Sequence, residues 1–107
     1  MPATSTPTLT LSFVAKLVAK PEKASEVADR LSQALSMAEQ EAGTVVWFAL
    51  RTDESTFWII DAFASEEARQ AHITGPIAAA LMANADRLLA EPLTILPADV
   101  LAAKVPA

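Results

Sequence analysis

The chain has no cysteine and no tyrosine, and it has only two glycines and one histidine in 107 residues. Without cysteine it cannot form disulfides, zinc fingers, iron–sulfur clusters or a catalytic thiolate. Two glycines leave no glycine-rich loop for a nucleotide or flavin phosphate. With one histidine, metal binding would depend on carboxylates, and these do not cluster at ligand spacing. We therefore expect no metal and no cofactor.

Basic residues are also few. Eight lysines and arginines stand against thirteen aspartates and glutamates, which gives a net charge of −5. The basic residues are scattered, so they predict neither a nucleic-acid interface nor an anionic membrane surface as partner. No apolar run reaches the roughly 18 residues of a membrane span, and residues 1–10 lack a signal-peptide pattern. We expect a cytoplasmic protein.

Hydrophobic residues are abundant, at 52% of the chain. A chain of this length suits one domain, and such a domain buries only about 60–65% of its unfolded surface. We predict a disordered N-terminal tail over residues 1–7, which are rich in Pro, Thr and Ser, and a single domain over residues 8–107. Part of the apolar surface is expected to contact a second copy of the chain.

The spacing of apolar residues changes along the chain. Residues 8–19 alternate between apolar and polar positions, which predicts a half-buried strand. Residues 21–42 place apolar side chains at helical spacing, with Pro21 in the first turn. Gly43 is expected to end this helix.

Two β-rich runs, residues 44–51 and 56–63, flank a short polar turn and predict a hairpin. Both faces of these runs are apolar, so we expect the hairpin to be central in a sheet and covered on both sides. Ser65 is expected to cap a following helix, which Gly75–Pro76 breaks. A second helical segment is expected over about residues 77–90.

A short strand at residues 93–96 completes the order β-α-β-β-α-β, and residues 100–105 form either a terminal strand or an arm. This order predicts an α+β, ferredoxin-like fold, an antiparallel sheet with both helices on one face. The other face would carry large apolar residues. We therefore expect a homodimer in which two sheets pack face to face.

His72 is the first candidate catalytic residue because it is the only side chain that ordinarily titrates near neutral pH. A neutral imidazole can take a proton from a phenol or quinol and so form the anion that reacts with oxygen. The alternative is a helix-end histidine that interacts with the C-terminal carbonyls. The sequence leaves both interpretations open.

Asp61 is the second candidate, because a carboxylate between Ile59 and Phe63 is costly unless it is paired. It could orient His72 as a base. Alternatively it is a solvated or salt-bridged residue at the end of a strand. Its candidate partners are Arg51, Arg69 and His72.

Several other residues are candidates for binding an aromatic substrate. The aromatic side chains Trp47, Trp58 and Phe63 could shape a flat pocket, although ordinary sheet core is the alternative for each. Alternation places Trp58 on the opposite sheet face from Phe63. Asn84 could donate a hydrogen bond to a bound carbonyl, or it could face solvent.

The stretch "TFWIIDAFASEEARQAHITGPIAAAL" resembles the antibiotic biosynthesis monooxygenase domain family. Its pattern is a strand that ends in an aromatic residue, an acidic helix start, an alanine–histidine pair, a small loop and an apolar helix. The upstream stretch "EQEAGTVVWFALRTDES" and the C-terminal "VLAAKV" are also similar to the family, so the resemblance runs from about Leu9 to Val105. It implies a dimeric α+β barrel with one pocket per subunit, between the sheet and the helices.

The resemblance implies several activities, because the family includes oxygenases that oxidise phenols or quinols without metal or flavin. It also includes haem-degrading enzymes, isomerases and members without known activity. For the haem-degrading branch, the resemblance implies a triad of Asn, Trp and His. Only His72 fits this triad here, because strand one lacks Asn and Ala62 stands in place of Trp. The family often has Tyr where Trp47 stands.

We therefore predict a cofactor-free monooxygenase that acts on a small aromatic or quinol-like substrate. The predicted catalytic residues are His72 and Asp61, and the predicted substrate-binding residues are Trp47, Trp58, Phe63 and Asn84. The alternatives are a small-molecule-binding or structural homodimer without catalytic activity and a cofactor-free isomerase.

Overall fold

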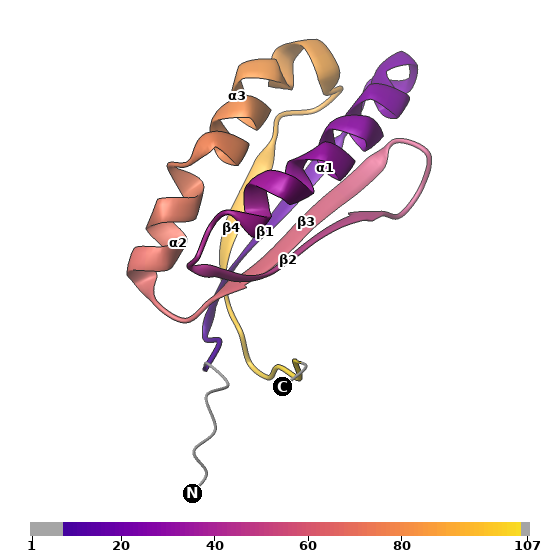
Figure 1. The fold of residues 1–107 in the computed structure, drawn as a ribbon. Helices are drawn as coiled ribbons and strands as arrows, with labels where there is room; N and C mark the ends of the chain where they lie inside the picture. Colours follow the sequence, from indigo (N-terminus) through magenta and orange to yellow (C-terminus); the bar gives the residue numbers. More distant parts are fainter. Residues whose placement is uncertain (1–7, 106–107) are drawn as a thin grey trace, which may run out of the picture.

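The computed structural model describes residues 8–105, and the predicted tail at residues 1–7 lies outside them. Within that range the chain has the predicted α+β, ferredoxin-like βαββαβ order (Figure 1). The elements are β1 (Leu11–Val18), the short 3₁₀ helix η1 (Pro21–Lys23), α1 (Ala24–Glu39), β2 (Thr44–Arg51), β3 (Thr56–Phe63), α2 (Glu66–Ile73), α3 (Pro76–Leu88) and β4 (Thr94–Asp99).

The four strands form one antiparallel sheet in the order β2-β3-β1-β4. The hairpin of β2 and β3 is present, but the prediction that it is central is wrong for β2, which is an edge strand. The reason is that β3 pairs with β1 on its other side, whereas β2 pairs with β3 alone. After β4, residues 100–105 form no further strand and leave as an arm, held by a hydrogen bond from the Val100 N–H to the Thr10 carbonyl (2.9 Å).

The helix ends follow from local sequence. The Ser65 hydroxyl accepts a hydrogen bond from the Ala68 N–H at the start of α2 (3.1 Å), as its capping role predicts. The end of α1 differs from the prediction, because the helix stops at Glu39 and Gly43 lies beyond it in the loop. Gly43 has another role: a Cβ there would lie 2.7 Å from the Ala68 Cβ, so glycine lets this loop lie against α2.

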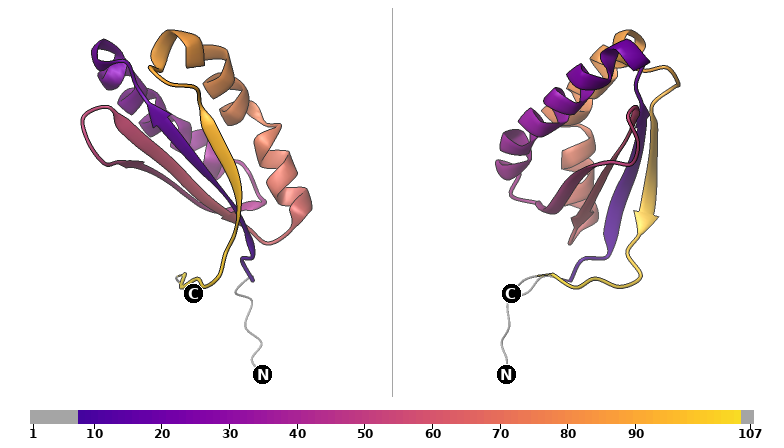
Figure 2. Two further views of the ribbon diagram at one scale, coloured as in Figure 1. Left: turned by 180° about the vertical axis from the view of Figure 1, so that it is seen from behind. Right: turned by 90° about the vertical axis from the view of Figure 1, so that its right-hand side faces the viewer.

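The helices cover one face of the sheet, as the edge-on view in the right panel of Figure 2 shows. Alternate residues of β1 and β3 point to that face and meet α1 and α3 in one core, which includes Leu17, Phe57 and Ile59 of the strands. Burial of an aliphatic or aromatic side chain stabilises the fold by about 1.5–3 kcal/mol. Among residues 8–105, no helix is both long and apolar enough to cross a bilayer.

The opposite sheet face has no helix over it, so the expected cover on both sides is not present within one chain. This outer face carries four large apolar side chains that are at least 36% exposed. They are Phe48 and Leu50 of β2, Ile60 of β3 and Leu96 of β4. We call this surface the outer face below.

Candidate functional site

His72 lies between two carboxylates on the helix side of the sheet. It projects from the last turn of α2, and its side chain is buried, with 6% of the residue exposed. The ring Nδ1 lies 2.6 Å from an Oε1 of Glu41, in the loop after α1. The ring Nε2 lies 3.2 Å from Oδ2 of Asp61 on β3. We call Glu41, Asp61 and His72 the histidine centre.

Both carboxylates of the histidine centre have further partners. The second oxygen of Asp61 accepts a hydrogen bond from the backbone N–H of Phe13 on β1 (2.8 Å). The Thr44 hydroxyl donates to Glu41 at 2.7 Å. The centre therefore ties together β1, β3, α2 and the α1–β2 loop, and it orients His72 from both sides.

The two carboxylate partners of His72 raise its pKa. Burial disfavours the cationic ring, but the hydrogen bonds and negative charges of Asp61 and Glu41 outweigh it, so the pKa of His72 is raised above its ordinary value of 6.5. The geometry therefore favours the imidazolium, which donates to both carboxylates. In this state His72 is a proton donor, and it accepts a proton only after losing one.

The free energy of unfolding is expected to fall as the pH rises above 6.5, because folding raises the pKa of His72. The stabilisation is complete below the unfolded-state pKa and is lost as the pH passes through the folded-state pKa. Urea unfolding midpoints over this range will show the fall, and His72→Gln should remove it. The chain has no other histidine and no cysteine, so an equal fall in the variant would contradict the assignment.

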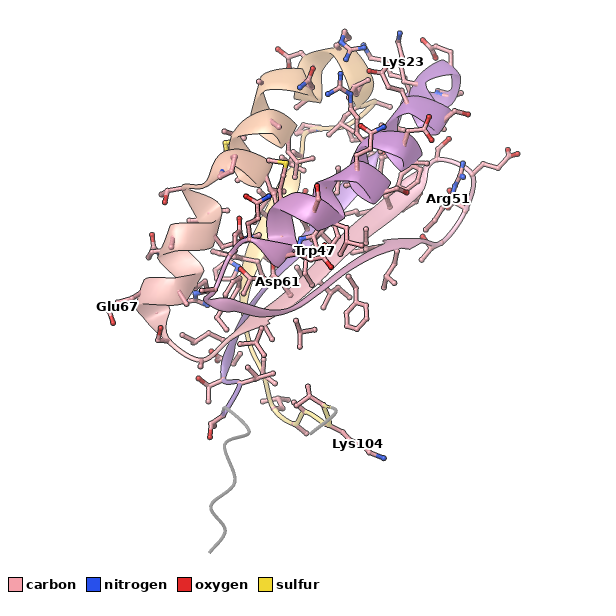
Figure 3. All side chains as sticks on the ribbon, in the orientation of Figure 1. Lys23, Trp47, Arg51, Asp61, Glu67 and Lys104 are labelled. Atoms are coloured by element: carbon pink, nitrogen blue, oxygen red, sulfur yellow. The ribbon has the colours of Figure 1, made fainter. Side chains whose placement is uncertain are left out.

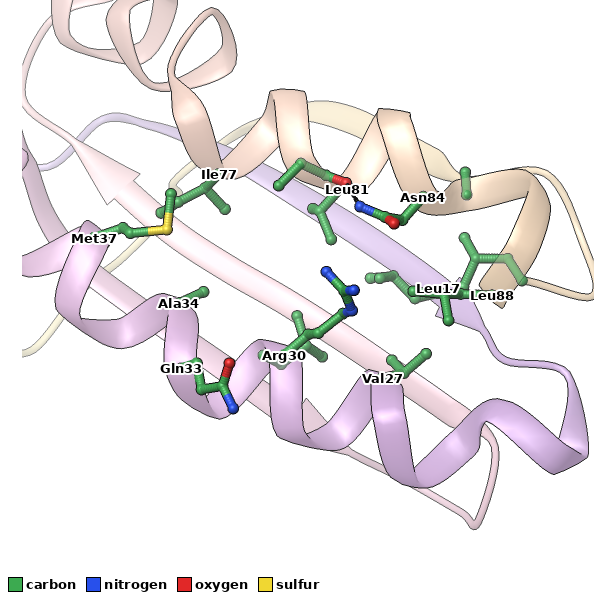
Figure 4. A pocket seen from close by; sticks show the side chains of 14 residues that line it. Leu17, Val27, Arg30, Gln33, Ala34, Met37, Ile77, Leu81, Asn84 and Leu88 are labelled. Atoms are coloured by element: carbon green, nitrogen blue, oxygen red, sulfur yellow. Dashed lines mark hydrogen bonds between the residues drawn. The ribbon is translucent and has the colours of Figure 1, made fainter.

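A pocket of about 170 Å³ lies elsewhere, between α1, α3 and β1 (Figure 4). Its lining is largely aliphatic, and it includes the polar side chains of Arg30, Gln33 and Asn84. His72 is not among the lining residues. The pocket and the histidine centre are thus two separate features on the helix side of the sheet.

The predicted site residues lie in three places, namely around the histidine centre, on the outer face and in the pocket. His72, Asp61 and Phe63 are together, with the Phe63 ring centroid 5.3 Å from that of His72. Trp47 lies on the same sheet face and pairs with Asp61 across β2 and β3 (Figure 3). Phe63 is completely buried, so it supports the histidine ring from the core.

Trp58 lies on the outer face, which corrects the prediction that it shapes one pocket with Trp47 and Phe63. Its neighbours there are Lys16, whose Nζ is 5.6 Å from the ring centroid, and Thr52, whose hydroxyl accepts a hydrogen bond from the indole N–H (3.1 Å). The alternation of side chains along β3 is the physical reason. Within one chain, Trp58 is therefore separated from both the pocket and the histidine centre by the sheet.

Asn84 does line the pocket, but its amide is already bonded. It donates to the Ala80 carbonyl one turn earlier in α3 (2.8 Å) and accepts from Arg87 (3.3 Å). Arg87 also makes a two-pronged ion pair with Glu26 of α1, at 3.0 and 2.7 Å. Asn84 thus belongs to a polar network that joins α1 to α3.

Glu41 and Glu26 are the residues that the sequence did not single out. The bonds from Arg87 and Arg30 lower the pKa of Glu26 to about 2. Glu26 and Arg30 are four residues apart, a spacing that indicates a helical ion pair, but Arg87 is 61 positions away. Glu41 lies 31 positions from His72, and no local pattern connects the two.

Two buried polar atoms have no hydrogen-bond partner among residues 8–105, namely Oε2 of Glu41 and the indole nitrogen of Trp47. Both belong to the part of the helix-side face around the histidine centre. Among residues 8–105, no group of three or more His, Cys, Asp or Glu side chains is arranged to hold a metal ion.

The family model of antibiotic biosynthesis monooxygenases matches residues 10–84. The chain therefore belongs to the antibiotic biosynthesis monooxygenase family. No curated protein matches the chain significantly.

Solved structures share this fold. A protein of unknown function from Nitrosomonas europaea is 50% identical, with a TM-score of 0.89 over 92% of this chain and 96% of that one. A Mycobacterium tuberculosis protein is 16% identical, with a TM-score of 0.79 over 90% and 99% of the two chains. A structure described as an antibiotic biosynthesis monooxygenase is 17% identical, with a TM-score of 0.74 over 86% and 99%. The last two likenesses show the fold alone.

Proposed function

We propose that this protein is a cofactor-free monooxygenase that oxidises a small aromatic or quinol-like substrate in the pocket between α1, α3 and β1. The observation that carries the proposal is the pocket itself, about 170 Å³ with an aliphatic lining and a few polar groups. Binding sites for small molecules have this composition. Membership of the monooxygenase family supports the reaction type.

The reaction needs no external reductant. One hydroquinone and one O₂ give one hydroxyquinone and one water, so the substrate supplies all four electrons that O₂ takes up. The reaction begins with the loss of a proton, which makes the electron-rich anion that reduces O₂. The polar side chains that line the pocket supply the groups to hold such an anion.

His72 and Asp61 remain the predicted catalytic pair, and the geometry sets a condition on that role. Both ring nitrogens of His72 are held by carboxylates. His72 can therefore take a proton from a substrate only after it has lost its own proton and released one carboxylate. The substrate must also extend beyond the pocket to reach the ring, because His72 is not among the lining residues. A base of this kind predicts a rate that rises with pH through the folded-state pKa of His72.

Oxygen uptake with a panel of hydroquinones is expected to exceed autoxidation, with one O₂ consumed per quinol. Leu81 lines the pocket, so Leu81→Trp should fill it and lower the rate about tenfold or more. Met82→Trp is the matched control, since Met82 is the next residue of α3 and is 55% exposed. Loss of the proposed base in His72→Gln should cost about 10²-fold or more.

Uptake no faster than autoxidation across the whole panel would reject the proposed reaction. Equal rates in the wild type and the Leu81→Trp variant would instead move the reaction out of this pocket. Product formed under nitrogen, in the absence of O₂, would favour the alternative of a cofactor-free isomerase.

A second candidate function is the binding of a small molecule without turnover. The observation that favours it is the position of His72, which is buried and does not line the pocket. Native mass spectrometry of the purified protein distinguishes the two functions when combined with the uptake assay. A bound small molecule that is released unchanged, together with no oxygen uptake, would support binding alone.

The proposal also includes a homodimer formed through the outer face. Four large apolar side chains are exposed there on three different strands, and a patch of this kind marks an interaction surface. The family resemblance, which implies a dimeric α+β barrel, supports the same arrangement. The predicted cytoplasmic location remains a prediction.

A further inference from the structure

Arg30 stands out among the fourteen side chains that line the pocket, all within residues 8–105, because it is the one that carries a formal charge. Its guanidinium group extends from α1 into the space between the helices, towards Leu81 and Asn84 of α3 (Figure 4). A full positive charge beside an aliphatic cavity is a specific feature, because it selects between ligands of the same shape and different charge.

The terminal nitrogens of Arg30 are free of protein partners within the described residues. The Nε atom donates to Oε2 of Glu26 at 2.9 Å, and no hydrogen bond joins Nη1 or Nη2 to residues 8–105. A guanidinium group has five N–H donors. Arg30 therefore keeps its outer donors for a group in the pocket or for water.

The charge around Arg30 does not cancel. Glu26 is shared, since it accepts from Arg30 and, through both oxygens, from Arg87. Within this group of three side chains, two arginines share one carboxylate, which leaves one positive charge. The chain as a whole has a net charge of −5. The local excess of positive charge is therefore opposite in sign to the net charge of the protein, and it favours the binding of an anion.

The size of the pocket limits the ligand. A cavity of about 150 Å³ lined by aliphatic and aromatic side chains binds benzene, and this pocket has about 170 Å³. One six-membered ring with a small substituent therefore fits the space. Leu31, Leu81 and Leu88 line the pocket and offer apolar contact to such a ring.

We propose that the pocket selects a single-ring molecule with an anionic substituent, a carboxylate or phenolate, and that Arg30 is the residue that binds the anion. The inference rests on the proposed function only for the choice of pocket. It adds the charge and size of the substrate and gives Arg30 the role of a specificity-determining residue.

Benzoate and benzamide test the inference, because they have nearly the same shape and differ in charge. Chemical-shift titrations of ¹⁵N-labelled protein at low ionic strength are expected to show benzoate binding about five- to tenfold more tightly than benzamide. Added salt should narrow the difference. Arg30→Gln should remove the preference for benzoate over benzamide.

Lys104→Gln is the matched control, because it makes the same change of charge at an exposed residue after β4. The control should keep the full preference, and Leu81→Trp should abolish the shifts caused by benzoate. No binding of benzoate, equal affinities in the wild type, or a preference that survives in Arg30→Gln would each overturn the inference. Because these titrations need no turnover, the inference and the proposed monooxygenase activity can fail separately.

Discussion

Replacing Asp61 with alanine is expected to lower the free energy of unfolding by about 3–5 kcal/mol, the usual cost of removing one partner from a buried charged pair. Asp61 is 2% exposed. Its two oxygens accept from two donors, the Phe13 N–H at 2.8 Å and the His72 Nε2 at 3.2 Å. Alanine would leave both groups buried without this acceptor. Urea unfolding at pH 6, where His72 is protonated, measures the loss.

Two further variants separate the charge of Asp61 from its shape. Asp61→Asn keeps an acceptor for Phe13 and removes the charge, so it should cost less than alanine, about 1–3 kcal/mol. Asp29→Ala removes a carboxylate from an exposed position of α1 and should change stability by less than about 0.5 kcal/mol. If Asp61→Ala is as mild as Asp29→Ala, the histidine centre does not hold the fold together.

The sequence predicted the strands and helices well where one face of an element is buried. The alternation in β1 and the helical spacing in α1 each reflect contact with the same core. The spacing of apolar residues in each element is therefore local and can be recognised from the sequence. The edge position of β2 could not be predicted from its own sequence, because both of its faces are apolar. That position results from β1 pairing with β3 and not with β2, and this pairing joins residues that are far apart in the sequence.

The site was predictable only in part. Asp61 was singled out because a carboxylate between Ile59 and Phe63 needs a partner, and His72 was among the candidate partners. Glu41 was missed, since its contact with His72 depends on how the α1–β2 loop lies against α2. A pocket between the sheet and the helices was expected from the family resemblance, and Asn84, a predicted binding residue, lines it. Arg30 was missed, because it and Asn84 come from different helices whose relative position no local pattern gives.

The register of the sheet explains why Asp61 fits at its position. The pairing of β1 with β3 is interrupted at Ser12 and Phe13, between the partners Leu11–Phe63 and Val14–Ile60. The backbone N–H of Phe13 donates to the Asp61 carboxylate at this interruption. A buried carboxylate therefore has a backbone donor as well as His72, which offsets the cost of its burial.

Replacing Phe48 with glutamate is expected to convert the proposed dimer into a monomer. Phe48 is 55% exposed at the outer face, beside Ile60 on the neighbouring strand. If two sheets pack face to face, a buried glutamate without a partner is costly. Two-fold symmetry places the substitution in the interface twice, so the dimer dissociation constant should rise about a hundredfold or more. Light scattering coupled to size-exclusion chromatography measures the mass.

Met82→Glu provides the matched control for the dimer, because Met82 is also 55% exposed but lies on α3, on the helix side of the sheet. It makes the same kind of change, from a large apolar side chain to a carboxylate, and should leave the dimer intact. Circular dichroism of the Phe48→Glu variant should match the wild type, because Phe48 is 55% exposed in the single chain and is not part of the buried core. A wild type that elutes as a monomer would contradict the dimer, and a Phe48→Glu variant that remains dimeric would place the interface on another surface.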